Sequence, residues 1–260
     1  MSDIQTTFIT GTDRQLHLLD LIEQRQRITV AEIVQQFAVS EATARRDLES
    51  LASQGKVQRV HGGAIAVAET PPELPILERK NEQEEEKYRI GRRAAELVRE
   101  GESIFLGSGT TVQEIARALR ERKNLTIITN SLPVLNILSG TENTIICLGG
   151  MLRLNELSFI GHITEQALAE VRADKVFMGT RAISLEHGLT HEYLPETMTD
   201  RAILRAGREI IVVADHTKFG RTATVLLAPL DKIHILVTNH QTDWEIIHAL
   251  RERNINIILA

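Results

Sequence analysis

The chain has 260 residues, a formal net charge of -5 and 42% hydrophobic residues, which is typical of a globular protein with enough apolar side chains for a sizeable core. No apolar run reaches the roughly 18 residues that a membrane helix needs, and residues 1–15 lack the basic-then-apolar pattern of a secretory signal. The single cysteine, Cys147, excludes an intramolecular disulfide and suits a small core residue in a reducing compartment. We therefore expect a cytoplasmic protein without a membrane partner. Its net negative charge requires that any nucleic-acid surface be a local positive patch.

Residues 1–68 carry helical patterns and form the first expected domain. Thr29 with Glu32 three positions later is a capping box, which predicts that a helix begins there. The short segment "FAV" predicts a turn, after which Ser40 caps a second helix that ends near Gly55.

The second helix has an inward and an outward face. Three residues at i, i+4 and i+7 are expected to pack inward: Ala44, Leu48 and Leu51. Ala42, Arg46 and Glu49 then lie on the opposite face, with Arg45 at its flank. The following "KVQRVHGG" predicts a short β-ribbon, and together these features favour a winged helix-turn-helix that reads the major groove over a merely solvated helix.

The segments "RQLHLLDLIEQ", "ITVAEIVQQFAVSEATARRDLESL" and "GKVQRVHGGA" resemble the N-terminal signature of the DeoR-type bacterial transcriptional regulators. In that family this segment is a winged helix-turn-helix that binds operator DNA. Ser40, Thr43, Arg45 and Arg46 match the family motif, and His61 with the two glycines matches the end of the wing. The expected DNA-binding residues are Ser40, Ala42, Thr43, Arg45, Arg46, Lys56, Arg59 and His61.

Residues 69–80 contain three prolines in five positions and predict an extended linker. The acidic run from Glu82 to Glu86 predicts the solvated start of a helix, and residues 81–260 form the second expected domain. Short Ile- and Val-rich segments alternate there with helical patterns, which favours a largely parallel sheet covered by helices. The predicted strands are residues 103–107, 125–129, 143–150, 174–179, 209–215, 232–238 and 255–260.

Polar residues follow several of these strands, where ligands of open α/β sheets bind. The loop "GSGTT" between a strand and a helix suits a phosphate, because glycines permit close approach and the helix start offers free N–H groups. Lys218 is the best candidate for a cation facing that phosphate. The candidate effector-binding residues are Ser108, Gly109, Thr110, Thr111, Thr129, Asn130, Gly149, Gly150, Glu196, Asp215 and Lys218.

The segments "GSGTT", "ITN", "LGG", "FIG", "GLT" and "ADHTKFG" are similar to the DeoR-type sensor domain. This resemblance implies a fold similar to ribose-5-phosphate isomerases and coenzyme A transferases, and a phosphorylated sugar or related metabolite as effector. In "PETMTDRAI" the chain has Asp200 where the family usually has a lysine, so the resemblance does not identify the exact effector.

Enzymatic activity is not expected. The segment "DKVFMGTRAIS" lacks the acidic pair that a sugar-phosphate isomerase needs, and "LTHEYLPETM" is not the glycine-bounded loop of a coenzyme A transferase. His187, His191 and Glu192 are interpreted as surface polar groups, so no metal site and no cofactor are expected.

The sequence thus predicts a homo-oligomeric, effector-controlled DNA-binding regulator, more readily a repressor than an activator. A metabolic enzyme with an appended DNA-binding module and a purely structural DNA-binding protein are the alternatives.

Overall fold

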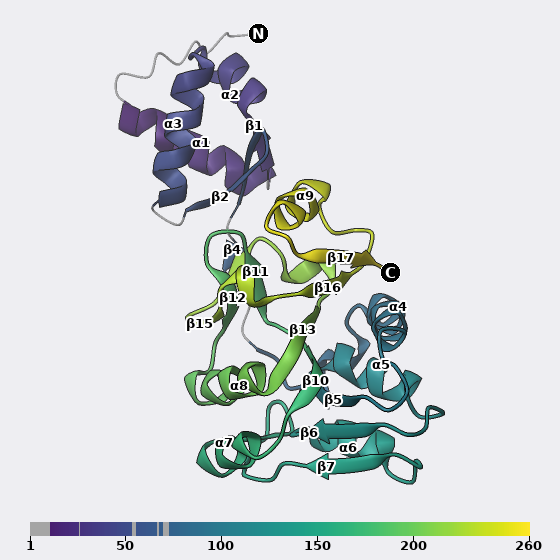
Figure 1. The fold of residues 1–260 in the computed structure, drawn as a ribbon. Coiled ribbons are helices and arrows are strands. Elements are labelled where there is room, and N and C mark those ends of the chain that lie inside the picture. The colour runs from purple at the N-terminus through teal and green to yellow at the C-terminus, as the bar shows by residue number, and fades with distance from the viewer. Residues whose placement is uncertain (1–10, 26, 54–55, 67, 70–72) are drawn as a thin grey trace. The chain divides into compact units, whose positions relative to one another are not determined.

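A computed structural model gives the fold of the chain, which consists of two compact units, residues 1–69 and 70–260. The structure describes residues 11–25, 27–53, 56–66, 68–69 and 73–260. Each unit has its own elements and is described by itself (Figure 1).

The first unit is a winged helix-turn-helix. Its elements are α1 (Gly11–Arg25), β1 (Arg27–Thr29), α2 (Val30–Phe37), α3 (Glu41–Ser53), β2 (Val57–Val60), β3 (Gly63–Ala66) and β4 (Ala68–Glu69). The capping box is confirmed, because the Thr29 hydroxyl accepts from the Glu32 amide at 3.2 Å and the Glu32 carboxylate accepts from the Thr29 amide at 2.7 Å. Ala38 ends α2 in the left-handed conformation (φ 52°), which makes the tight turn into α3. Strands β2 and β3 form the predicted antiparallel ribbon, and β1 pairs with β3 on its other side.

The core of this unit forms between α1, α2, α3 and the ribbon. The three inward residues predicted for α3, Ala44, Leu48 and Leu51, are buried in it. An ion pair also joins α1 to α3, because the Arg14 guanidinium donates to the Asp47 carboxylate at 2.6 and 3.1 Å. The predicted end of α3 at Gly55 lies outside the described residues.

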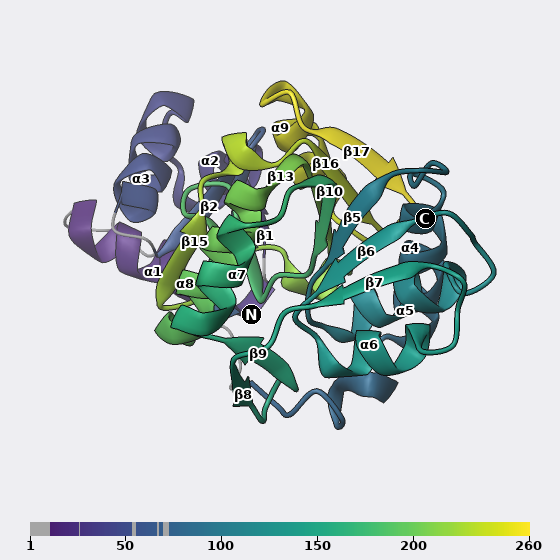
Figure 2. The ribbon, with the colours of Figure 1, turned by 60° about the horizontal axis from the view of Figure 1, so that its bottom comes forward.

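The second unit is built on a seven-stranded sheet in the order β17-β16-β13-β10-β5-β6-β7, in which every pairing is parallel. Its strands are β5 (Ser103–Leu106), β6 (Thr126–Thr129), β7 (Thr144–Cys147), β10 (Ala173–Met178), β13 (Gly207–Val213), β16 (Ile235–Thr238) and β17 (Asn256–Leu259). These are the seven strands that the sequence predicts. From β5 the chain adds β6 and β7 on one side, and it later returns to add β10, β13, β16 and β17 on the other (Figure 2).

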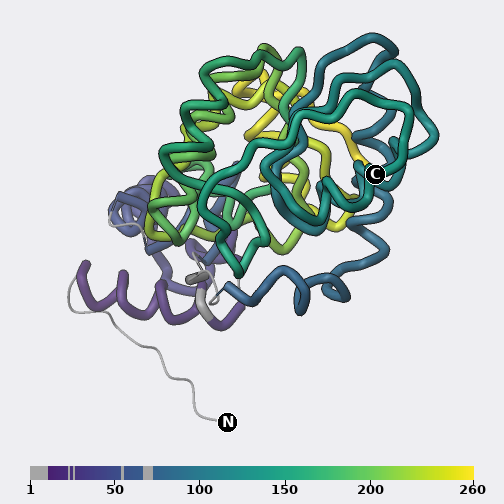
Figure 3. Tube along the Cα trace, turned by 90° about the horizontal axis from the view of Figure 1, so that it is seen from below, coloured from purple at the N-terminus to yellow at the C-terminus, as the bar shows by residue number. Residues whose placement is uncertain are grey.

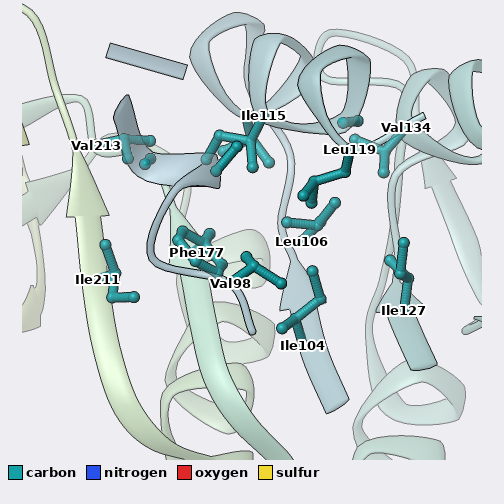
Figure 4. Packing of buried hydrophobic residues seen from close by; sticks show 14 of the residues in the cluster. Val98, Ile104, Leu106, Ile115, Leu119, Ile127, Val134, Phe177, Ile211 and Val213 are labelled. Carbon is teal, nitrogen blue, oxygen red and sulfur yellow. The ribbon is translucent and has the colours of Figure 1, made fainter. Parts of the chain in front are cut away.

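Helices cover this sheet. They are α4 (Glu84–Ala95), α5 (Thr110–Ala118), α6 (Leu132–Leu138), α7 (His162–Ala169), α8 (Leu194–Ala206) and α9 (Trp244–Glu252). Apolar side chains of α4, α5 and α6 pack with the central strands in one continuous core, which includes Ile115, Val134 and Phe177 (Figure 4). Among the described residues no helix is long and apolar enough to cross a membrane.

Several short elements were not predicted. They are β8 (Met151–Arg153), β9 (Ser158–Ile160), β11 (Ala182–Ser184), β12 (Gly188–His191), β14 (Arg221–Thr222), β15 (Val225–Ala228) and the 3-10 turns η1 (Arg79–Asn81), η2 (His216–Lys218) and η3 (Leu230–Lys232). Strands β11, β12 and β15 form an antiparallel sheet in a region that the sequence presents as a long loop. The strands among them have two to four residues, too few to show alternation, and none carries a run of Ile and Val residues.

Part of the predicted linker belongs to the second unit. Ile76 is 2% exposed, and its amide donates to the Asn155 carbonyl at 2.7 Å. Arg79 is also buried, and its side chain donates to the Leu74 carbonyl at 2.9 Å. The chain therefore packs from residue 73 onward before it enters α4 (Figure 3), whereas residues 70–72 lie outside the described residues.

The Arg14–Asp47 pair predicts a local stability effect. Asp47→Ala should destabilise the first unit by about 2–3 kcal/mol, because it removes a charge-assisted hydrogen bond and leaves the mostly buried Arg14 without its carboxylate. Amides of α1 and α3 should then exchange roughly 30- to 150-fold faster in hydrogen-exchange mass spectrometry. The control is Glu49→Ala, which removes an exposed carboxylate from the same helix. Equal exchange in the two variants would refute a structural role for the pair.

Candidate functional site

The first candidate surface is the exposed face of α3. Ser40 caps this helix, since its hydroxyl accepts from the Thr43 amide at 3.2 Å and lies 2.8 Å from the Thr43 hydroxyl. Ala42, Arg45 and Arg46 are exposed, as the helical spacing predicts. A helix with this exposed start has the dimensions and donors to read a major groove.

Arg45 and Arg59 near this surface make different interactions. Arg45 pairs with Glu41 one turn earlier at 2.5 Å, and exposed pairs of this kind are weak enough to exchange for a phosphate. Arg59, on β2, is half-buried and donates to the Arg45 carbonyl at 3.3 Å. Burial lowers the pKa of Arg59, although the nearby Glu49 carboxylate opposes that shift. Arg59 thus links the ribbon to α3.

Lys56, just before β2, and His61, in the turn between β2 and β3, are both exposed. The glycine pair at its tip has a steric explanation, since a Cβ on Gly63 would lie 2.1 Å from the Ile28 carbonyl oxygen. Only glycine therefore allows β3 to approach β1 this closely. The eight predicted DNA-binding residues are thus distributed over the capped start of α3, its exposed face and the adjoining ribbon.

The second candidate site is a pocket in the sheet-containing unit, at the point where the strand order reverses. It encloses about 620 Å³ of empty space, including the part open to solvent. Polar residues after three adjacent strands, β5, β10 and β13, line it. In a parallel sheet such a reversal leaves a crevice at the carboxyl ends of the strands, because the connections on either side lead away from it. The predicted site residues in this lining are Ser108, Gly109, Thr110, Thr111, Glu196, Asp215 and Lys218.

The loop between β5 and α5 forms one wall. Gly109 caps α5 with φ 112°, a conformation that favours glycine. Thr110 and Thr111 open the helix and are both buried. The first amides of a helix have no partner within it and carry the positive end of its dipole, so this wall can bind an anion.

Two lysines face this wall. Asp215 caps the turn η2 by accepting from the Thr217 amide at 2.9 Å, which places Lys218. The Lys218 ammonium makes no hydrogen bond to any residue that the structure describes, and burial lowers its pKa while Asp215 opposes the shift. Burial likewise lowers the pKa of Lys87 to about 8, and its ammonium donates to the Arg79 carbonyl at 2.7 Å. Both lysines would gain from a bound anion, which would stabilise their charged forms.

Another part of the lining, the acidic wall, is buried and rich in carboxylates. Arg79 pairs with Glu156, and Arg153 pairs with both Glu73 and Glu196. Burial raises the pKa of Glu156 to about 8, and the nearby carboxylates of Glu196 and Glu73 raise it further, while Arg79 opposes the shift. Burial and Asp200 raise the pKa of Glu196 to about 7, with Arg153 opposing. The pocket lining therefore combines helix amides and lysines with buried, ion-paired carboxylates.

Four predicted site residues lie outside the pocket lining. Thr129 donates to the Leu106 carbonyl at 2.7 Å, and Asn130 donates to the Phe159 carbonyl at 2.9 Å. Gly149 accepts from the Thr164 hydroxyl at 2.9 Å, and Gly150 follows it. Thr129 ends β6 and Asn130 follows it, and the two glycines follow the edge strand β7, whereas the pocket lies at β5, β10 and β13.

Other pocket residues were missed. Glu73, Arg79, Glu82, Lys87, Glu156, Arg181 and His191 also line it. The interpretation of His191 as a surface group is wrong, because it is 7% exposed at the end of β12, although His187 is exposed as expected. Nothing local in the sequence shows that β12 is a buried strand. The buried Asp200 lies next to His191, with Nδ1 and Oδ2 3.1 Å apart.

Comparisons with known proteins agree with this two-part architecture. Residues 14–70 match the DeoR-like helix-turn-helix domain, and residues 82–240 match the DeoR C terminal sensor domain. A partial likeness to ribose 5-phosphate isomerase A from Methanocaldococcus jannaschii has 19% identity and a TM-score of 0.40, over 53% of this chain and 55% of that one.

Curated relatives match over nearly their whole length. The glycerol-3-phosphate regulon repressor of Escherichia coli (strain K12) is 34% identical over 96% of this chain and 99% of its own. The transcriptional regulator IolR of Bacillus subtilis (strain 168) is 32% identical over 90% and 93%. The putative aga operon transcriptional repressor of Escherichia coli O157:H7 is 31% identical over 97% and 95%. The chain belongs to the DeoR family and is therefore a DNA-binding transcriptional regulator rather than an enzyme.

Proposed function

We propose that the chain is a repressor of a carbohydrate-metabolism operon, and that a phosphorylated sugar or related metabolite in the pocket controls it. The names of its relatives, which refer to the glycerol-3-phosphate regulon and the aga operon, support this class of regulon. As a DNA-binding protein of this kind it would act in the cytoplasm.

One observation carries the effector class: the start of α5 and two lysines line the same pocket. A phosphate carries up to two negative charges and accepts several hydrogen bonds, so it matches the helix amides, the Thr110 and Thr111 hydroxyls and Lys218. The acidic wall suits the hydroxyl groups of a sugar, because carboxylates accept hydrogen bonds from hydroxyls.

Control requires the pocket and α3 to be coupled. A regulator needs two states whose DNA affinities differ, and effector binding must favour one of them, typically by about 1–3 kcal/mol. In a homo-oligomer, two recognition helices would bind half-sites about one helical turn of DNA apart, so a small change in their spacing would weaken binding.

The direct test is fluorescence anisotropy of the full chain on DNA from upstream of its own operon, with a panel of sugar phosphates titrated at fixed salt. One compound should reverse tight binding. Lys218→Ala should lose that response and keep its DNA affinity, whereas Lys232→Ala, which removes an exposed lysine outside the pocket lining, should respond normally. Specific DNA binding that no compound alters would refute the effector class and favour a purely structural DNA-binding protein.

The lowered pKa of Lys87 predicts pH-dependent effector binding. Below about pH 8 Lys87 is protonated in the free protein and attracts the anion fully; above that pH, binding requires proton uptake. Effector affinity should therefore fall by up to about tenfold per pH unit above pH 8. Calorimetry between about pH 7.5 and 9.5, where a phosphate keeps both charges, measures this fall. Lys87→Gln should bind more weakly with a flatter profile, and an unchanged profile would exclude Lys87 from the site.

Arg46→Ala should weaken operator binding by about 1–3 kcal/mol, or roughly 5- to 150-fold, without altering effector binding. If Arg46 contacts a base, discrimination between operator and altered operator should fall. If it contacts a phosphate, the salt dependence should instead decrease by about one charge. Arg208→Ala, which removes an exposed arginine of the second unit, is the control. Equal operator affinity in both variants would contradict the assignment of α3 as recognition helix.

A further inference from the structure

Three side chains of metal-ligating type meet beside the acidic wall of the pocket: His191 at the end of β12, and Glu196 and Asp200 in α8. We call them the His191 cluster. Glu196 and Asp200 are four residues apart and therefore project from the same side of α8. One ligand atom from each residue lies within 4.8 Å of the others, and the three residues are 6–7% exposed.

The cluster contains buried polar atoms without hydrogen-bond partners. Neither ring nitrogen of His191 makes a hydrogen bond with a described residue, although Nδ1 lies 3.1 Å from an Asp200 oxygen. Within the same described part of the chain, Glu196 Oε1 is also unpartnered, while Oε2 accepts from Arg153. Buried polar atoms almost always have partners, so this arrangement points to a species that all three side chains can bind.

The surrounding charges favour a cation. Three of the buried or half-buried carboxyl groups here, those of Glu73, Glu156 and Glu196, pair with the guanidinium groups of Arg79 and Arg153. Neither arginine is paired with Asp200 among the described residues. Uncompensated negative charge is costly away from water, and a divalent cation at the cluster would offset it.

An ion pair between a protonated His191 and Asp200 is the simpler alternative. It accounts for the 3.1 Å distance but leaves Glu196 Oε1 and the second ring nitrogen without partners. A metal ion about 2.0–2.2 Å from each ligand atom needs those atoms roughly 3–4 Å apart, so side-chain movements below about 1 Å would complete the site. One imidazole and two carboxylates suit Zn²⁺ or Mn²⁺, whereas Mg²⁺ prefers oxygen ligands alone.

We propose that His191, Glu196 and Asp200 bind a divalent transition-metal ion of the Zn²⁺ or Mn²⁺ class. Because His191 and Glu196 also line the pocket, the remaining coordination positions would face it and could accept an oxygen of a bound ligand. This site goes beyond the proposed function, since it requires neither DNA nor a particular effector.

The test uses the full chain, freed of metal by a chelator and titrated with Zn²⁺, Mn²⁺ or Mg²⁺ in competition with a chromophoric chelator. One equivalent of Zn²⁺ or Mn²⁺ should bind per chain, and more tightly than Mg²⁺. His191→Gln and Asp200→Asn should each weaken binding by at least about tenfold. His187→Gln, which alters an exposed histidine four residues earlier, should bind like the original chain. Binding that survives both cluster substitutions, or is lost in the control, would overturn the site.

A second measurement uses the original chain alone, so it does not require the substituted chains to fold. Co²⁺ bound to the original chain should show ligand-field bands without a thiolate charge-transfer band, because the single cysteine, the exposed Cys147, is not in the cluster. A thiolate band, or no binding at all, would refute the proposal. Neither DNA nor sugar phosphate is present in these titrations, so their failure leaves the effector proposal standing, and failure of the effector titration leaves the metal site standing.

Discussion

The reversal of strand order between β5 and β10 is the constraint on which the sensor pocket depends. Every strand of this sheet runs in the same direction, so all carboxyl ends lie at one edge. At most positions along that edge, connections run over the sheet in the same sense. Only where the order reverses do the loops after β5 and β10 lead apart, and there the start of α5, Arg181 and Lys218 share one space.

Buried ion pairs then determine which other segments of the chain line the pocket. Arg153 pairs with Glu73 and Glu196, and Arg79 pairs with Glu156, so segments far apart in the sequence are joined in one wall. Such pairs contribute little net stability after desolvation, but removing one partner is costly. The wall is therefore better suited to fixing geometry than to stabilising the fold.

The sequence was sufficient to locate the strands of the parallel sheet and the helices α2 and α3. It was insufficient to show which segments lie next to one another in the fold. Ile- and Val-rich segments located the seven strands, and a capping box with a spaced apolar stripe located α2 and α3. The rule that ligands follow strand ends selected Ser108 and Lys218, which line the pocket, and also Asn130 and Gly149, which lie outside its lining, because strand order cannot be obtained from strand positions alone. Arg79 was not selected, because it lies in the proline-rich segment that the sequence presents as an extended linker. It reaches the pocket through tertiary packing, which leaves no local periodicity.

The central pairing of the sheet also has a consequence for folding. Strands β5 and β10 are neighbours, yet Ile104 pairs with Lys175 across a long stretch of intervening chain, and Lys218 comes later still. Contacts between distant residues form slowly, because a long loop must close before any contact is gained. The winged helix-turn-helix has short-range contacts and a core of its own. During synthesis, the part that reads DNA can thus be complete while the part that senses the effector does not yet exist.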